Sequence, residues 1–285
     1  MTNTMKNEKT IGITGASGYL GRNLIPMFLS SGIKVVAFSR NNLKFQFSSP
    51  NLKYVNVESY INLPKINCDY IIHFAEDSHN NNKIENIRDI ESKIENLKAI
   101  IRNTKAKIIY ASSGLVYNNL NLLAKSESDL INIDNHYKKI KIENENFVLK
   151  NNGLVLRLSS VIGEYPAKNT LIYDIRNLVI NELPLILKNT NVIRDFLSIR
   201  DLFNFIIKLV ELNLYGIFNV SYGKGTKLLK LCELIQEKYN KPLAKFTSLK
   251  KSNFTDFLVL DNRKIKKETK YSPKDDISTI IKNLK

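Results

Sequence analysis

Three side chains in the middle of the chain could together move a proton to and from a hydroxyl or carbonyl group. Tyr137 and Lys141 stand four residues apart, so on a helix they share one face and can touch a common ligand. A free phenol is a poor acid or base at neutral pH, but a neighbouring ammonium favours its phenolate form. Ser113 ends an apolar run, and its hydroxyl could hold the same oxygen in place. We therefore expect a Ser-Tyr-Lys centre that exchanges a proton while a nicotinamide exchanges hydride.

A glycine-rich segment near the N-terminus has the spacing of a phosphate-binding loop. Gly15, Gly18 and Gly21 lie three residues apart, directly after the apolar run 10–14 and before a predicted helix. The first glycine permits a tight turn, the second lets backbone approach a pyrophosphate, and the third lets the helix pack closely on the sheet. An ordinary glycine-rich turn is the alternative. The other candidate cofactor contacts of this loop are Ser17, Tyr19 and Leu20.

The end of the second apolar run bears on the choice of cofactor. This run, 34–38, leads into Ser39 and Arg40, at the distance where a carboxylate would bind an adenosine ribose. No carboxylate stands there, and a guanidinium suits a 2′-phosphate. We therefore expect NADP(H) as the preferred cofactor, with NAD(H) possible. The alternative is a solvated arginine at a strand end.

Apolar runs that alternate with helical stretches indicate how these groups are positioned. The predicted buried strands are 10–14, 34–38, 54–57, 70–75, 107–111 and 154–158. Continuous apolar strands separated by helices predict a parallel sheet covered on both faces, and right-handed crossovers make it doubly wound. The expected fold is α/β, a Rossmann-type doubly wound parallel sheet with a smaller C-terminal α/β substrate domain. We expect a NAD(P)-binding domain over 1–163, with 192–221 returning to it, and a mainly substrate-binding domain over 164–285.

Composition limits the other possibilities. The chain has 285 residues, of which 43% are hydrophobic and 25% charged, in the range of globular proteins. Cys68 and Cys232 lack the spacing of a disulfide framework or zinc site, and no apolar run approaches the roughly 20 residues of a membrane helix. We expect a cytoplasmic protein with no metal and no membrane partner. The net charge of +16 is spread along the chain without aromatic interleaving, which favours an anionic small substrate over nucleic acid.

The sequence resembles a known protein family over nearly its whole length. It is similar to the extended short-chain dehydrogenases/reductases of the nucleotide-sugar epimerase/dehydratase superfamily. The segments that carry the resemblance are 14–21, 73–76, 112–117, Glu127 before Tyr137 and Lys141, 157–163, 194–196 with 201–202, 216–220 and 261–273.

The resemblance implies further site residues and a partner. Asn56 and Val57 should flank the adenine, and Phe74, Ala75 and Glu76 should line the cofactor. The implied substrate contacts are Ser113, Ser160 (where the family usually has asparagine), Arg194 on the pyrophosphate of a nucleotide-sugar substrate, and Lys251. The family usually forms dimers, so the resemblance implies a homodimer.

The residues after Ser113 bear on the reaction. Dehydratases of this superfamily carry an Asp-Glu pair there, whereas this chain has Gly114 and Leu115, which cannot transfer protons. The superfamily members that epimerise twice use a cysteine and a histidine, and no cysteine is suitably placed. With these two reactions disfavoured, the remaining chemistry is reversible oxidation and reduction at C4 of the sugar. Arg40 favours NADP(H)-dependent reduction of a nucleotide-linked 4-keto sugar, with an NAD-dependent nucleotide-sugar C4 epimerase as the alternative.

Three less favoured hypotheses stay open. They are a reductase of small carbonyls without a nucleotide, an RNA-binding relative and a non-catalytic NADP-sensing protein on the same fold.

Overall fold

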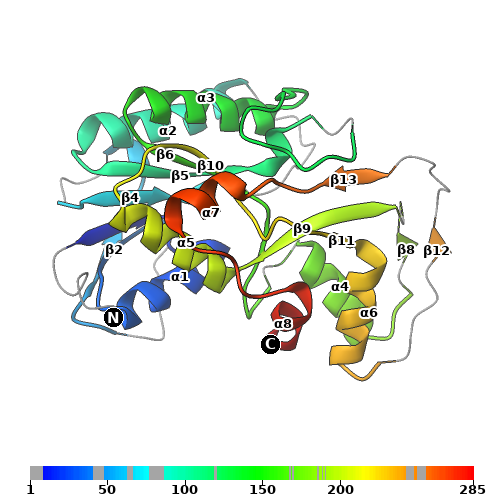
Figure 1. The fold of residues 1–285 in the computed structure, drawn as a ribbon. Helices are drawn as coiled ribbons and strands as arrows, with labels where there is room; N and C mark the ends of the chain where they lie inside the picture. The colour runs from blue at the N-terminus through cyan, green and yellow to red at the C-terminus, as the bar shows by residue number, and fades with distance from the viewer. Residues whose placement is uncertain are drawn as a thin grey trace. The chain divides into compact units, whose positions relative to one another are not determined.

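The chain folds into two compact units. A computed structural model describes residues 9–40, 48–62, 67–76, 87–118, 121–166, 168, 170–184, 186–187, 189, 191–241, 247–248 and 255–285 (Figure 1). The first unit combines Met1–Val116, Asn132–Arg157 and Leu209–Phe218, and the second combines Tyr117–Ile131, Leu158–Lys208 and Asn219–Lys285. The predicted substrate contact Lys251 lies outside the described residues.

A seven-stranded sheet forms the centre of the first unit, in the order β10-β6-β5-β4-β1-β2-β3. Its strands are β1 (Thr10–Thr14), β2 (Lys34–Ser39), β3 (Leu52–Asn56), β4 (Tyr70–His73), β5 (Lys107–Ser113), β6 (Leu154–Leu158) and β10 (Gly216–Val220). The pairs β1–β2, β1–β4, β2–β3 and β4–β5 are all parallel. The predicted Rossmann-type α/β fold is therefore confirmed.

The order of the strands reverses beside β1. β2 pairs with one side of β1 and β4 with the other, so the chain after β1 emerges at a topological switch point. In open α/β sheets, ligands bind at the carboxyl ends of the strands at such a point. The central strands are buried because both faces of the sheet are covered; Ile11 and Ile13 of β1 are fully buried, as are Val155 and Leu156 of β6.

Three helices of this unit matter for the site: α1 (Tyr19–Ser30), α2 (Ile87–Asn103) and α3 (His136–Lys150). Helix α3 begins at Asn135, whose side chain accepts a hydrogen bond from the backbone N–H of Lys138 at 3.0 Å. Such a cap satisfies one of the donors that the first turn leaves unpaired. Helix α3 lies beside α2 (Figure 1), and the ammonium of Lys98 stands 5.6 Å from the ring centre of Phe147.

The second unit is built around strand β9 (Val192–Ser198). Strands β7 (Ser160–Ile162) and β13 (Asp256–Leu258) pair with it in parallel, and β11 (Gly225–Lys227) pairs antiparallel. Two short strands, β8 (Ile186–Leu187) and β12 (Thr247–Ser248), form a separate pair. The remaining helices are α4 (Leu171–Ile180), α5 (Ile199–Glu211, which continues into the first unit), α6 (Leu228–Lys238), α7 (Arg263–Thr269) and α8 (Ile277–Lys282), and there are short 3-10 turns at Tyr60–Asn62 (η1) and Gly114–Val116 (η2).

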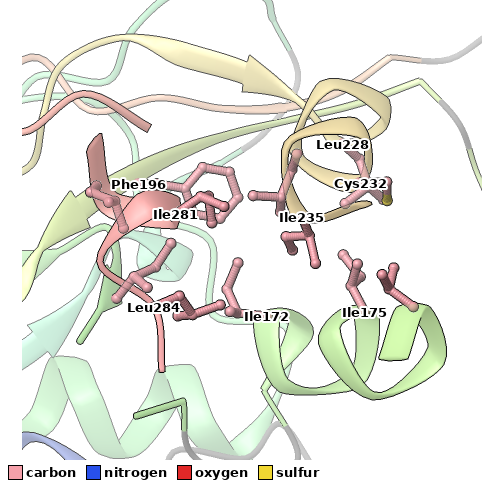
Figure 2. Close-up of a cluster of buried hydrophobic side chains, with 12 residues drawn as sticks. Ile172, Ile175, Phe196, Leu228, Cys232, Ile235, Ile281 and Leu284 are labelled. Carbon is pink, nitrogen blue, oxygen red and sulfur yellow. The ribbon is translucent and has the colours of Figure 1, made fainter. Parts of the chain in front are cut away.

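A separate hydrophobic core holds the second unit together. Figure 2 shows side chains from α4, β9, α6 and the C-terminal segment meeting there, among them Ile172, Phe196, Cys232 and Ile281. Cys232 is fully buried and free, and burial raises the pKa of its thiol to about 11, so it acts as a small apolar side chain.

Asp201, which is almost fully buried, ties the C-terminal segment to the start of α5. Its carboxylate accepts hydrogen bonds from the Tyr271 hydroxyl at 2.6 Å and from the backbone N–H groups of Lys274 at 2.9 Å and Asp275 at 3.0 Å. The Ser198 hydroxyl donates to it as well, at 2.9 Å. The carboxylate therefore supplies hydrogen-bond acceptors to a segment of the chain that is neither helix nor strand.

We expect Asp201→Ala to destabilise the protein by about 3 kcal/mol, because it leaves several buried donors unpaired at once. Urea unfolding followed by circular dichroism measures the change. Glu268→Ala is the matched control, since Glu268 is exposed on α7 of the same unit and should change the free energy of unfolding by less than about 0.5 kcal/mol. Equal effects of the two substitutions would contradict the assigned role of Asp201.

Candidate active site

The glycine loop after β1 has the geometry that a phosphate-binding loop requires. Gly15 has φ +67°, and a Cβ there would lie 2.8 Å from backbone atoms of Phe74 and Ala75. A Cβ on Gly21 would lie 2.6 Å from the Gly15 carbonyl oxygen. Gly18 is the N-cap of α1 and offers no side-chain acceptor to the first turn of the helix. The N–H groups at the start of α1, which include those of Tyr19 and Leu20, are therefore suited to an anion.

The residues predicted to bind the adenosine lie at the ends of β2 and β3. Ser39 is buried, and its hydroxyl donates to the Ser17 hydroxyl at 3.1 Å. Arg40 follows it on the surface. Asn56 ends β3 exposed, and the backbone N–H of Val57 donates to the Ser39 carbonyl at 2.9 Å. The structure thus brings the predicted adenosine residues to one edge of the sheet.

The sequence prediction missed Tyr60, which belongs to the same region. Its side chain is buried, and its hydroxyl accepts a hydrogen bond from the N–H of Gly15 at 3.0 Å. Burial raises the pKa of Tyr60, and the Gly15 N–H and the positive charge of Arg40 partly oppose that rise. Tyr60 lies in the short η1 turn, and no sequence pattern there indicates a contact with the glycine loop.

The proposed catalytic side chains also belong to one unit. Ser113 ends β5, and its hydroxyl accepts from the N–H of Leu115 at 3.2 Å. Tyr137 and Lys141 lie on α3, with the lysine ammonium 5.6 Å from the centre of the tyrosine ring. The same ammonium donates to the carbonyl of Ala111 in β5 at 2.7 Å, which fixes α3 against that strand. The helix therefore presents Tyr137 and Lys141 on the side that faces β5.

Glu76 is the counter-ion of Lys141, a role that the sequence did not predict. The resemblance placed it on the cofactor, but its carboxylate forms an ion pair with the Lys141 ammonium at 2.7 Å, and both side chains are less than one tenth exposed. Each carboxylate oxygen lies 2.9 Å from the Tyr110 hydroxyl, and Asn144 donates to one of them at 2.6 Å. The lysine of the predicted centre therefore has a built-in counter-charge.

The pair is charged at neutral pH. Burial lowers the pKa of Lys141, but the adjacent carboxylate of Glu76 outweighs burial and the net pKa lies above the ordinary value. Burial likewise raises the pKa of Glu76, and the ammonium of Lys141 reverses the direction, so the net pKa lies below the ordinary value. His73 is different, because burial lowers its pKa to about 4 and keeps its ring neutral. Its Nδ1 shares a hydrogen bond of 2.8 Å with the Thr14 hydroxyl, as expected of a packed core histidine.

A second buried ion pair lies further along the same face of α3. The guanidinium of Arg157 in β6 contacts the Glu145 carboxylate at 2.7 Å, and Ser112 of β5 also donates to that carboxylate. Sequence reasoning did not single out Glu145. Its signal is the spacing Tyr137, Lys141, Glu145, which puts three polar side chains in register on a helix face that should otherwise be apolar.

The remaining predicted residues belong to the second unit. Arg194 lies in β9 and forms an ion pair with Asp256 at 2.5 Å, while Ser160 lies exposed at the start of β7. Glu127, matched to the acid that precedes the family's tyrosine, accepts from the backbone N–H of Asn219 at 2.8 Å. Asp195, next to Arg194, is buried and accepts from the N–H groups of Tyr222 and Gly223, both at 3.0 Å. Burial raises the pKa of Asp195 to about 6.

The close backbone approach at Gly15 and the uncapped start of α1 fit a dinucleotide. The loop 15–21 would hold its pyrophosphate, and the ends of β2 and β3 would hold its adenosine. Among the described residues, no group of three or more His, Cys, Asp or Glu side chains could hold a metal ion. No described helix is long and apolar enough to cross a membrane.

Solved structures share this fold across nearly the whole chain. UDP-glucose 4-epimerase of Thermotoga maritima with UDP-glucose is 18% identical, with a TM-score of 0.83 over 96% of this chain and 97% of that one. dTDP-glucose 4,6-dehydratase of Bacillus anthracis with NAD is 18% identical, with a TM-score of 0.82 over 97% and 95%. UDP-glucuronic acid 4-epimerase of Bacillus cereus, a tyrosine-to-phenylalanine mutant with NAD and a fluorinated UDP-glucuronic acid, is 18% identical, with a TM-score of 0.81 over 96% and 97%. At this identity the likeness concerns the fold.

The sequence itself gives the family. No curated protein is similar enough in sequence to match the chain. The model of the NAD dependent epimerase/dehydratase family matches residues 11–221, which include the glycine loop, Ser113, Tyr137 and Lys141. The chain therefore belongs to the NAD-dependent epimerase/dehydratase family.

Proposed function

We propose that this enzyme is a nucleotide-sugar C4 epimerase that keeps NAD bound through its catalytic cycle. The observation that carries the proposal is the placement of Tyr137 and Lys141 on the face of α3 that packs against β5, the strand that Ser113 ends. Similar solved structures add support, since two of the three reported above are 4-epimerases by their printed names.

The residues divide the chemistry between them. Tyr137 would accept the proton of the C4 hydroxyl and later return it to the resulting carbonyl oxygen. Ser113 would donate a hydrogen bond to the same oxygen and orient it. Lys141, whose ammonium lies 5.6 Å from the centre of the Tyr137 ring, would bind the ribose next to the nicotinamide. NAD held by the loop 15–21 would supply the hydride acceptor and donor that inversion at C4 requires.

Dehydration fits the site poorly. The η2 turn follows Ser113 directly, and it carries Gly114, which is buried, and Leu115, whose side chain is 41% exposed. Neither side chain can donate or accept a proton, so elimination of water would lack its acid and base at these positions.

Reduction of a nucleotide-linked 4-keto sugar with NADPH is the second candidate, and Arg40 is the observation that favours it. An exposed guanidinium directly after β2 suits a 2′-phosphate. The neighbouring Ser39 offers less support, because its hydroxyl is buried and already donates to Ser17. Both candidates include two further proposals: the enzyme forms a homodimer, and Arg194 contacts the pyrophosphate of the substrate.

We expect Tyr137→Phe to lower kcat at least a hundredfold, because it removes the group that moves the proton. The assay follows the interconversion of C4 epimers across a panel of UDP- and dTDP-linked hexoses, uronic acids and N-acetylhexosamines. Tyr215→Phe is the control, since Tyr215 is 71% exposed and should leave the rate within twofold. Wild-type turnover in the Tyr137 variant would remove the proposed mechanism.

The cofactor itself separates the two candidates. We expect the purified protein to release about one NAD per chain when it is denatured, since an epimerase recovers its cofactor in each cycle. Chromatography of the supernatant measures the nucleotide, and Arg40→Ala should leave the NAD content unchanged. An empty protein that binds NADPH, and loses at least tenfold in NADPH affinity with Arg40→Ala, would instead favour the reductase.

A further inference from the structure

We infer that Glu76 sets the oxidation state of the bound cofactor: by balancing the charge of Lys141, it makes the site bind NAD⁺ more tightly relative to NADH than the lysine alone would. The inference rests on the proposed use of NAD. It assigns to Glu76 the role of a positioning and charge-balancing residue, which acts through Lys141.

The geometry of the pair is fixed rather than adaptable. The Glu76 carboxylate receives the ammonium at 2.7 Å, the Tyr110 hydroxyl at 2.9 Å and the Asn144 amide at 2.6 Å. The ammonium in turn donates to the Ala111 carbonyl at 2.7 Å. These two contacts use two of its three N–H donors and leave one for a ligand.

The pair also lies next to the predicted cofactor path. Glu76 directly follows Phe74 and Ala75, whose backbone is so close to Gly15 that a Cβ there would lie 2.8 Å away. The N–H of Glu76 donates to the Phe74 carbonyl at 2.9 Å and closes the turn that carries the carboxylate. The N–H of Phe74 donates to the Thr14 carbonyl at 3.2 Å, which holds this turn beside the start of the glycine loop. At its other end the pair reaches Tyr137, whose ring centre is 5.6 Å from the ammonium.

Other titratable groups around the pair contribute little net charge. His73 from β4 is neutral, because burial lowers its pKa to about 4. Tyr110 from β5 is also neutral, because burial and the nearby carboxylate of Glu76 raise its pKa well above the ordinary value. Glu145 from α3 is paired with Arg157 at 2.7 Å. Apart from Tyr137, the proposed proton-transfer group, the balance between Glu76 and Lys141 therefore decides the local charge within the described residues.

The consequence for the cofactor follows from the charge of its ring. The nicotinamide of NAD⁺ is cationic and that of NADH is neutral, so an unbalanced ammonium nearby disfavours the oxidised form. A carboxylate that neutralises the ammonium removes this bias. Both charges are buried, so solvent and salt screen them little, and the effect is expected to reach about tenfold in relative affinity, or about 30 mV in the potential of the bound couple.

A charge cycle tests the inference by binding alone, without any sugar. The dissociation constants of NADH, from its fluorescence, and of NAD⁺, from its displacement of NADH, are measured after charcoal treatment has removed copurifying nucleotide. Relative to wild type, Glu76→Gln should shift the affinity ratio about tenfold towards NADH. Lys141→Met should shift it about tenfold the other way. The double variant and Glu76→Asp should stay within about threefold of wild type, because the net charge of the two side chains at positions 76 and 141 is again zero.

A purely structural role for Glu76 would weaken both nucleotides equally and leave the ratio unchanged, which would overturn the inference. If Glu76→Gln does not fold, since it leaves a buried ammonium unpaired, then Lys141→Met and the double variant decide, and equal ratios in these two variants would overturn it. Failure to bind either nucleotide would overturn it together with the proposed function. The expected ratios without sugar turnover would reject only the proposed function, and turnover with unchanged ratios would reject only the inference.

Discussion

A lysine that must stay charged inside a packed layer needs an opposite charge in contact with it, and this requirement organises the first unit. Lys141 has it in Glu76, in the turn after β4, and Glu145 on the same helix has it in Arg157 of β6. Burying an ion is expensive unless it is paired and hydrogen-bonded, so both pairs fix α3 to particular strands. Replacing such pairs with apolar side chains often costs nothing, which makes stability a poor reason for their presence and chemistry a better one.

The sheet provides what these pairs require. β4 and β5 are parallel neighbours, so Glu76 and Ser113 leave the sheet at the same edge, and α3 packs along β5. The reversal of strand order beside β1 brings the glycine loop to this edge as well. The turn after β4 touches that loop at Gly15 and carries Glu76, so it links the predicted phosphate loop to the proposed catalytic side chains of α3.

Much of this arrangement could be predicted from the sequence. Continuous apolar strands, three glycines at fixed spacing and a tyrosine four residues before a lysine are local patterns, and each implies a definite geometry. The contact between Glu76 and Lys141 could not be predicted in this way, because the two residues belong to distant segments and only the folded sheet brings them together. The hydrogen bond from Gly15 to Tyr60 escaped prediction for the same reason. Glu145 was accessible in principle, since a charge on the inner face of a helix calls for a partner.

The glycine loop restricts which substitutions a relative of this protein could tolerate. At Gly15 any side chain would collide with the backbone of Phe74 and Ala75, and the conformation itself is one that residues with a Cβ rarely adopt. The packing of β1 against α1 and β4 therefore demands glycine even in a descendant that had lost turnover and kept only the scaffold. In such a protein the loop would survive while Tyr137 and Lys141 drifted, so the helix face, rather than the glycines, records whether catalysis has been retained.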